Sequence, residues 1–248
     1  IYEKLQNANK SGISPDNYTL EAYWFNYMLT RNRGVISLKQ YNLSYLTSDY
    51  ALYWFDYIGE YRTILAQIGW NSSVEQQIAQ VRGAATLQNK DWGTIVTWKY
   101  SHAPYLDTPN NIYKQMATSY NAGAKYIIIF NYSNTTRIDP YGGAMTDSHF
   151  QALKDFWTQV VTKTAPNSVQ AEAAFVLPKD YGFGLRRVDD RIWGFWGPDD
   201  KSLVIWSNTQ TLLNKYGLKL DIVYDDPTFP VQGNYSKIYY WNQTIIVI

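Results

Sequence analysis

Residues 63–98 read TILAQIGWNSSVEQQIAQVRGAATLQNKDWGTIVTW and contain two apolar runs separated by a helical pattern. The runs TILAQI at 63–68 and TIVTW at 94–98 are short and apolar, as buried strands are. Between them, apolar residues recur at helical spacing after a Ser-Ser start, which predicts a helix over about 73–88 with one buried face formed by Val74, Ile78, Val81 and Ala85. Strand, helix and strand in this order predict a parallel sheet covered by helices.

The same alternation continues on both sides of this unit. We expect further strands at Ala51–Tyr57 (ALYWFDY) and Lys125–Asn131 (KYIIIFN), and helices at 18–31, 110–121 and 147–163. Four such strands make half of an eight-stranded barrel or part of a Rossmann-like sheet. The barrel is favoured because its active-site face is formed by the carboxyl ends of the strands. Polar and aromatic residues stand at these ends: Asp56, Gln67, Trp98, Lys99 and Asn131.

A second pattern begins after Pro166, where Asn167-Ser168 indicates a linker. We expect residues 1–164 to form the C-terminal part of a (β/α)₈ barrel of the TIM type. Residues 165–248 are expected to form an incomplete flavodoxin-like α/β domain. Its predicted elements are strands at 173–177, 220–224, 237–241 and 244–248 and a helix at 201–215.

Composition excludes several classes of partner. The formal net charge is +1 and no basic stripe occurs, so nucleic acid is not an expected partner. No apolar run reaches 18 residues, so we expect no membrane span in this segment. There is no cysteine, and two histidines do not make a metal site, so no metal or cofactor is expected. The chain starts at Ile1 without Met or a signal peptide, and we expect it to be a segment of a longer polypeptide.

The glycosylation motif Asn-x-Ser/Thr occurs seven times, against about two or three expected by chance from this composition. Asn131 is the weakest candidate, because it lies at a strand end. We expect glycans at Asn17, Asn42, Asn71, Asn134, Asn234 and Asn242. Together with the absence of cysteine and the high tyrosine content, this excess predicts an extracellular or cell-surface protein of archaeal type.

Two carboxylates stand at and just after the carboxyl end of the first predicted strand. Glycoside hydrolysis uses two carboxyl groups, about 5 Å apart for retention and about 6.5–9.5 Å apart for inversion. Asp56 and Glu60 lie in one predicted strand-to-helix loop and are therefore the candidate catalytic residues. The alternative is that Asp56 hydrogen-bonds a neighbouring loop and that Glu60 is solvated.

Aromatic residues make up 17% of the chain, with 23 Tyr and 10 Trp. Such rings fill cores, and they also stack on sugar rings. Trp54, one layer below Asp56 in the predicted strand, and the run Trp98-Lys99-Tyr100 are the candidate substrate-binding residues. Alternatively, Trp98 only caps the sheet interior. His149, at a predicted helix start, is expected on the surface.

The loop 182–196 (GFGLRRVDDRIWGFW) interleaves three arginines with two aspartates. Guanidinium groups bind carboxylates in bidentate geometry. The loop is thus either a carboxylate-binding element or an ion-pair network that ties the second domain onto the barrel, and the nearly balanced charges favour the network.

Strand ends WFDY, VTWKY and IIIFNY, followed by FVLPKDYGFGLRRVDDRIWGFW, resemble archaeal glycoside-hydrolase-like surface proteins. In these, a (β/α)₈ barrel precedes a glutamine-amidotransferase-like domain, as in family 42 β-galactosidases. The resemblance implies polysaccharide as substrate or ligand. It covers nearly the whole chain and is architectural, since the catalytic Asn-Glu pair of that clan is absent from these strands and the trailing domain lacks a cysteine nucleophile.

Two hypotheses about function therefore stay open. One is a glycoside-hydrolase-like protein that acts on or binds polysaccharide. The other is a structural cell-surface glycoprotein, such as an S-layer or filament subunit, whose aromatic residues mediate self-association or contact the rest of the polypeptide.

Overall fold

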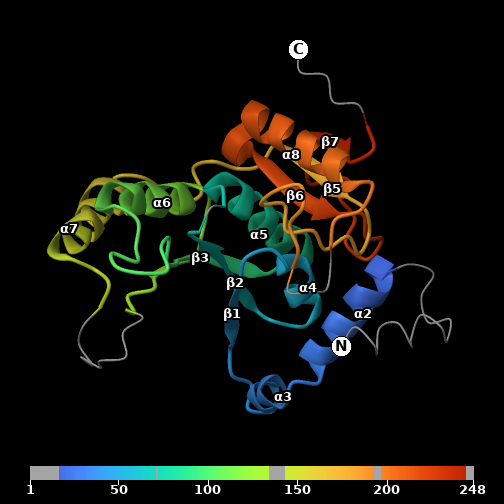
Figure 1. Ribbon diagram of the computed structural model, residues 1–248, viewed down its shortest axis with the longest axis horizontal. Helices are drawn as coiled ribbons and strands as arrows, with labels where there is room; N and C mark the ends of the chain where they lie inside the picture. The colour runs from blue at the N-terminus through green and yellow to red at the C-terminus, as the bar shows by residue number, and fades with distance from the viewer. Residues whose placement is uncertain (1–16, 71, 134–142, 193–196, 244–248) are drawn as a thin grey trace.

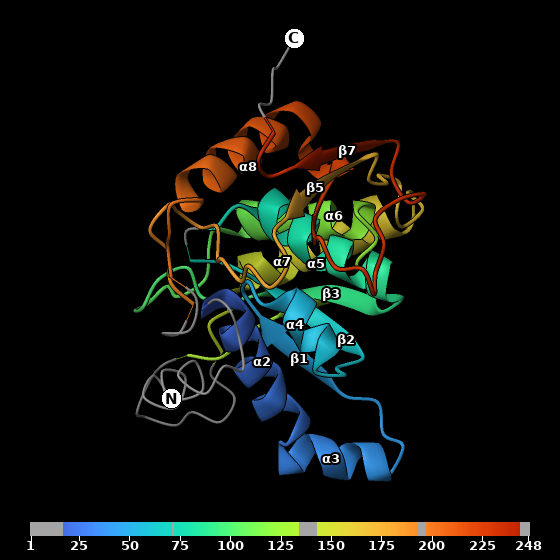
Figure 2. The same ribbon diagram turned by 90° about the vertical axis from the view of Figure 1, so that its right-hand side faces the viewer.

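The computed structural model describes residues 17–70, 72–133, 143–192 and 197–243. It contains two parallel sheets joined through shared helices (Figures 1 and 2). Its strands are β1 (Leu46–Asp49), β2 (Thr63–Ile68), β3 (Asp91–Val96), β4 (Tyr126–Ile129), β5 (Ala173–Leu177), β6 (Leu220–Tyr224) and β7 (Lys237–Tyr240). Its α-helices are α2 (Asn17–Thr30), α3 (Arg33–Gln40), α4 (Tyr53–Ile58), α5 (Val74–Gln88), α6 (Pro109–Asn121), α7 (Asp147–Phe156) and α8 (Ser202–Tyr216).

The first sheet has the strand order β1-β2-β3-β4, so each strand pairs in parallel with the one before it in sequence. The second sheet has the order β6-β5-β7 and is also parallel. The prediction of an α/β chain with parallel sheets is confirmed. So are the strands at 63–68, 173–177 and 220–224 and the helices near 18–31, 73–88, 110–121 and 201–215, within a residue or two at their ends.

Local chemistry sets the ends of the central helix α5. The Ser73 hydroxyl accepts a hydrogen bond from the Gln76 amide at 3.3 Å, which caps the first turn. Asn89 ends the helix in the left-handed conformation, with φ of 52°. In the helix predicted at 147–163, a π-helical turn over Trp157–Val161 continues α7, so this pattern covers two kinds of helix.

The predicted strand Ala51–Tyr57 is wrong, because this stretch contains the helix α4. The Asp49 carboxylate accepts hydrogen bonds from the amides of Ala51 and Leu52, at 2.7 and 2.8 Å, and this turns the chain out of the extended conformation. The strand that pairs with β2 lies just before this turn, at β1. Asp56 consequently sits on a helix between two strands, and not at the carboxyl end of one.

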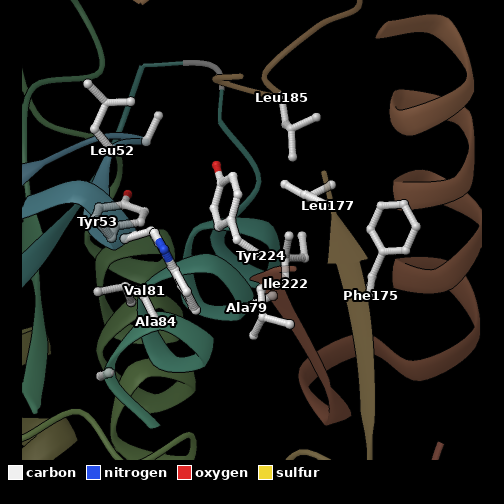
Figure 3. Packing of buried hydrophobic residues seen from close by; sticks show 14 of the residues in the cluster. Leu52, Tyr53, Ala79, Val81, Ala84, Phe175, Leu177, Leu185, Ile222 and Tyr224 are labelled. Atoms are coloured by element: carbon white, nitrogen blue, oxygen red, sulfur yellow. The ribbon is translucent and has the colours of Figure 1, made fainter. Parts of the chain in front are cut away.

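Helix α5 lies between the two sheets (Figure 1). Its residues 76–85 are all buried, because it packs on the first sheet and also on β6 of the second. One apolar cluster therefore continues from the first sheet through α4 and α5 to β5 and β6 (Figure 3). The predicted buried face of this helix is present, and the second sheet covers the opposite face as well.

Gly83 is the point of closest approach between α5 and β6. A Cβ added there would lie 2.7 Å from the Ile222 carbonyl oxygen and 2.9 Å from the Val223 side chain. We expect Gly83→Ala to lower the unfolding free energy by about 1 kcal/mol, because overpacking costs about 1–3 kcal/mol and alanine returns about 1 kcal/mol of helix propensity. Urea denaturation measures the change, and Thr86→Ala, at an exposed position of the same helix, is the matched control. A stabilised Gly83→Ala protein would contradict this close packing.

The two faces of the first sheet differ. Ile64, Ala66 and Trp92 point to the face covered by α4 and α5, and Val96 and Ile129 extend this face toward α6. The strand register places Leu46, Tyr126 and Ile128 on the opposite face, where each keeps a large exposed area. We call this second surface the open face. Toward the carboxyl ends of β1 and β2, this face carries a polar pair, in which the Gln67 amide donates to the Ser48 hydroxyl at 3.2 Å.

Candidate functional site

The residues predicted to form one site lie in three different places. Trp54 and Asp56 are on α4, each 3% exposed. The Trp54 ring packs against the rings of Tyr224 and Phe229, with centroids 5.3 and 5.8 Å away. This packing fixes α4 onto the second sheet and leaves Trp54 no free face for a sugar.

Asp56 is a buried carboxyl group without an open cleft around it. Its Oδ2 atom has no hydrogen-bond partner among the described residues. Burial raises the pKa of Asp56 well above its ordinary value, and the nearby carboxylate of Asp49 raises it further. A raised pKa is what a general acid needs, but the group is closed off from substrate by the surrounding core.

Glu60 lies beyond the end of α4, at the amino end of β2. It is exposed, has a positive φ of 76°, and pairs with Lys39. Because all strands of this sheet are parallel, the amino ends gather at one edge and the carboxyl ends at the other. Glu60 is thus at the opposite edge from Trp98 and Lys99, and the two predicted halves of the site do not meet.

The carboxyl edge of the first sheet carries an aromatic rim. The rim rings follow β2, β3 and β4 and come from Trp70, Trp98, Tyr100, Tyr105, Phe130 and Tyr132. Four of them are well exposed: Trp70 by 45%, Tyr100 by 39%, Phe130 by 40% and Tyr132 by 60%. Rings in such numbers at one edge present apolar, flat surface to solvent.

Trp98 contacts the other loops that carry the rim rings. Its indole N–H donates to the Tyr132 carbonyl at 2.7 Å, and its ring centroid lies 5.5 Å from Tyr105 and 5.8 Å from Phe130. The loop after β3 is therefore fixed to the loop after β4. Trp98 and Tyr100 are the two predicted substrate-binding rings that belong to the rim.

Lys99 is held in the same loop by Asp107, at a distance of 2.9 Å. Asp107 also accepts hydrogen bonds from the Thr108 amide and the Asn111 side chain, at 2.7 and 3.0 Å. Burial alone would raise the pKa of Asp107, but these donors and Lys99 outweigh it and hold the pKa below its ordinary value. Asp107 is thus an ionised, fully occupied carboxylate that positions the rim.

A hollow of about 430 Å³ opens beside the rim, between the loops after β2 and β3. Its lining combines polar and apolar groups in about equal measure and includes the side chain of Gln115. We call it the rim hollow, and it is lined by Gly69, Trp70, Ser72, Ser73, Lys99, Asp107 and Gln115. Hydroxyl, amide and ammonium groups next to an exposed indole match the hydroxyls and the apolar C–H face of a sugar ring.

The prediction that His149 lies on the surface is wrong, because this residue is 4% exposed. Its Nδ1 accepts the Thr146 amide at 3.1 Å, closing a capping box at the start of α7. Its Nε2 is therefore the protonated nitrogen and donates to the Asp107 carbonyl at 2.9 Å. His149 thus anchors α7 to the loop that carries Lys99.

In the described part of the arginine loop, Arg186 and Arg187 form ion pairs within the loop itself, whereas the predicted network tied the second domain onto the barrel. Arg186 makes a two-pronged contact with the buried carboxylate of Asp190, at 2.8 and 2.6 Å, and its guanidinium lies over the Tyr50 ring. Arg187 pairs with Asp189 at 3.0 Å. Residues 193–196 lie outside the described residues. Within the described part of the loop, these two arginines are paired with its own aspartates.

Asn42, Asn234 and Asn242 are exposed, so the structure leaves their side chains accessible to modification. The side chain of Asn17 and all of Asn71 and Asn134 lie outside the described residues. Asn131 is exposed, but its side-chain oxygen accepts the Met145 amide at 2.7 Å. Glycosylation of these positions stays a prediction.

Sequence reasoning missed Trp70, Tyr105, Phe130 and Tyr132. Trp70 and Tyr132 come just after predicted strands, Phe130 lies at the end of one, and Tyr105 lies in the loop that follows another, which was the available signal. In the described residues, no group of three or more His, Asp or Glu side chains is placed to hold a metal ion. No helix there is long and apolar enough to cross a membrane. Comparison with family models, curated proteins and solved structures finds no match for this chain.

Proposed function

We propose that this chain is a polysaccharide-binding part of an extracellular glycoprotein, related in architecture to glycoside hydrolases. The observation that carries the proposal is the aromatic rim with its adjoining hollow at the carboxyl edge of a parallel sheet. Exposed rings such as Trp70 and Tyr132 supply the flat apolar surface on which sugars stack, and the hollow supplies polar groups for their hydroxyls.

The finer fold in this proposal is the second half of a (β/α)₈ barrel followed by a flavodoxin-like layer. Three features support the barrel half. Strand order follows chain order in the first sheet, helices α4, α5 and α6 pack on one face, and the open face carries exposed apolar residues and a polar pair. In a closed barrel, this face would be the interior. The order β6-β5-β7 places the first strand of the second sheet in the middle, as a flavodoxin-like layer does.

We propose binding rather than hydrolysis as the activity of this segment. Asp56 is buried and Glu60 is at the other edge, so the carboxylate pair that glycoside hydrolysis needs is not formed by them. Asp107 lines the rim hollow, but it is engaged by Lys99, Thr108 and Asn111.

Isothermal titration of the 248-residue chain with a panel of soluble glucans, mannans, galactans and xylans tests the proposal. We expect one class to bind and expect Trp70→Ala and Tyr132→Ala each to weaken binding about tenfold or more, the loss that about 1.4 kcal/mol of stacking energy represents. Tyr41→Ala is the matched control, because Tyr41 is 76% exposed and lies far along the chain from the rim, after α3.

The structural alternative is favoured by a specific observation, the apolar open face with Tyr126 and Ile128. Such a surface drives association between copies or with further chain. Absence of binding to the whole panel, together with concentration-dependent association in sedimentation velocity, would replace the binding proposal with this alternative.

A further inference from the structure

A second and larger hollow lies at the amino edge of the first sheet. Its volume is about 630 Å³, and it is formed by the segment before β1 together with the residues that lead into β2 and β3. We call it the amino-edge hollow; it is lined by Lys39, Asn42, Leu43, Tyr45, Glu60, Arg62, Asn89, Lys90 and Asp91.

The charges of this hollow are unevenly paired. Glu60 pairs with Lys39, and Asp91 pairs with Lys125, which approaches from outside the lining at 2.6 Å. Arg62 and Lys90 have no carboxylate partner in the part of the chain that the structure describes. The hollow thus has two unneutralised cations, which favour an anionic ligand.

Neutral features of the hollow match a sugar. The Tyr45 ring lies edge-on to Tyr61, with centroids 5.5 Å apart, and its hydroxyl donates to the Glu60 carbonyl at 2.9 Å, so its position is fixed. The side chains of Asn42 and Asn89 add amide donors and acceptors. A fixed ring, amides and free cations together fit a ligand that carries hydroxyls and a carboxylate.

We infer that the amino-edge hollow binds an acidic sugar through its carboxylate, with Arg62 and Lys90 as the anion-binding groups. This sugar has two sources. Asn42, which lines the hollow, begins the motif Asn42-Leu43-Ser44, so an acidic residue of a glycan on Asn42 reaches the hollow directly. The other source is a free acidic polysaccharide.

The first test uses the whole chain made in a host without N-glycosylation, titrated with a galacturonate tetramer and followed by amide NMR shifts. We expect shifts at Glu60, Asn89 and Lys90. Arg62→Gln and Lys90→Gln should each raise the dissociation constant about tenfold or more, since a hydrogen bond to a charged group contributes about 1.5–3 kcal/mol. Lys154→Gln, which removes the same charge from the exposed surface of α7, should leave binding unchanged.

Two results would overturn the inference. One is no binding of the tetramer, or binding that Arg62→Gln and Lys90→Gln leave unchanged. The other is displacement of the tetramer by equimolar inorganic phosphate, which would show a site for any anion rather than for a sugar. A neutral galactose tetramer should not shift the amide signals of Glu60, Asn89 and Lys90.

The second test separates the two sources. Protein from a glycosylating host is compared with its Ser44→Ala variant, which removes the motif without changing a lining residue. If the glycan on Asn42 is the occupant, the glycosylated protein will not bind free tetramer and Ser44→Ala will restore binding. Equal binding by both assigns the hollow to free polysaccharide. Trp70→Ala, at the opposite edge of the sheet, should weaken binding at the rim but leave tetramer binding unchanged. It therefore distinguishes a failure of the amino-edge proposal from a failure of the rim proposal.

Discussion

Arg82→Met is expected to lower the unfolding free energy by about 3–5 kcal/mol, the cost of leaving one partner of a buried ion pair unpaired. Arg82 on α5 and Asp221 on β6 are 2.8 Å apart, with side chains 6% and 1% exposed. The guanidinium also donates to the carbonyls of Leu218, Leu220 and Val169. Without it, a buried carboxylate and three carbonyl acceptors at the junction of the two sheets lose their hydrogen-bond donor.

Chemical denaturation of the parent and three variants checks this expectation. Lys125→Met removes an exposed partner of Asp91 and should leave the stability nearly unchanged, because an exposed ion pair contributes little. Arg82→Met combined with Asp221→Asn should recover part of the loss, because asparagine keeps an acceptor for the Tyr235 hydroxyl but carries no charge. A loss below about 1 kcal/mol for Arg82→Met would show that the pair does not hold the sheets together.

The unit β2–α5–β3 was predictable because its signals are local. Two apolar runs of strand length and a capped helical pattern lie within 36 residues, and the helix buries its apolar face against the two strands. The second covered face of α5 was not predictable, since it depends on β6, more than 130 residues away. Gly83 and the small neighbours Ala79 and Ala84 were its only local sign.

Helix α4 was misread because it is buried all round. Its residues YWFDYI show neither helical nor strand periodicity, and a short apolar run cannot be assigned by pattern alone. Asp49, whose carboxylate accepts the amides of Ala51 and Leu52, was the signal for a turn at this point. β1, with the sequence LTSD, was missed because an edge strand that is partly exposed carries few apolar residues.

The candidate site was only partly predictable for a related reason. Trp98, Lys99 and Tyr100 were found because they are adjacent in sequence. Trp70, Phe130 and Tyr132 come from other loops, and only the strand order shows that these loops meet at one edge. Misreading α4 as a strand also placed Asp56 at that edge, and this error produced the predicted carboxylate pair.

Asp56→Asn is expected to raise the unfolding free energy at pH 7, because the buried side chain then needs neither a charge nor a bound proton. Asp56 is 3% exposed, and burial and Asp49 raise its pKa well above 3.8. At neutral pH the folded protein must therefore bury a charge or hold a proton that the unfolded chain releases. Asparagine does neither.

The pH dependence gives the sign of this effect. The pKa of Asp56 is higher in the folded protein than in the unfolded chain. The stability that protonated Asp56 contributes is therefore fully present below about pH 3.8, and it is lost as the pH rises toward the folded pKa. The difference between Asp56→Asn and the parent should thus be smallest near pH 4 and grow toward pH 7, as measured by urea denaturation at each pH. Glu60→Gln, at an exposed carboxylate, is the control and should show no such growth. A destabilised Asp56→Asn protein at pH 7 would mean that the ionised carboxylate has a partner in the fold. If the parent hydrolyses a polysaccharide and the folded Asp56→Asn variant does not, Asp56 is a catalytic residue after all.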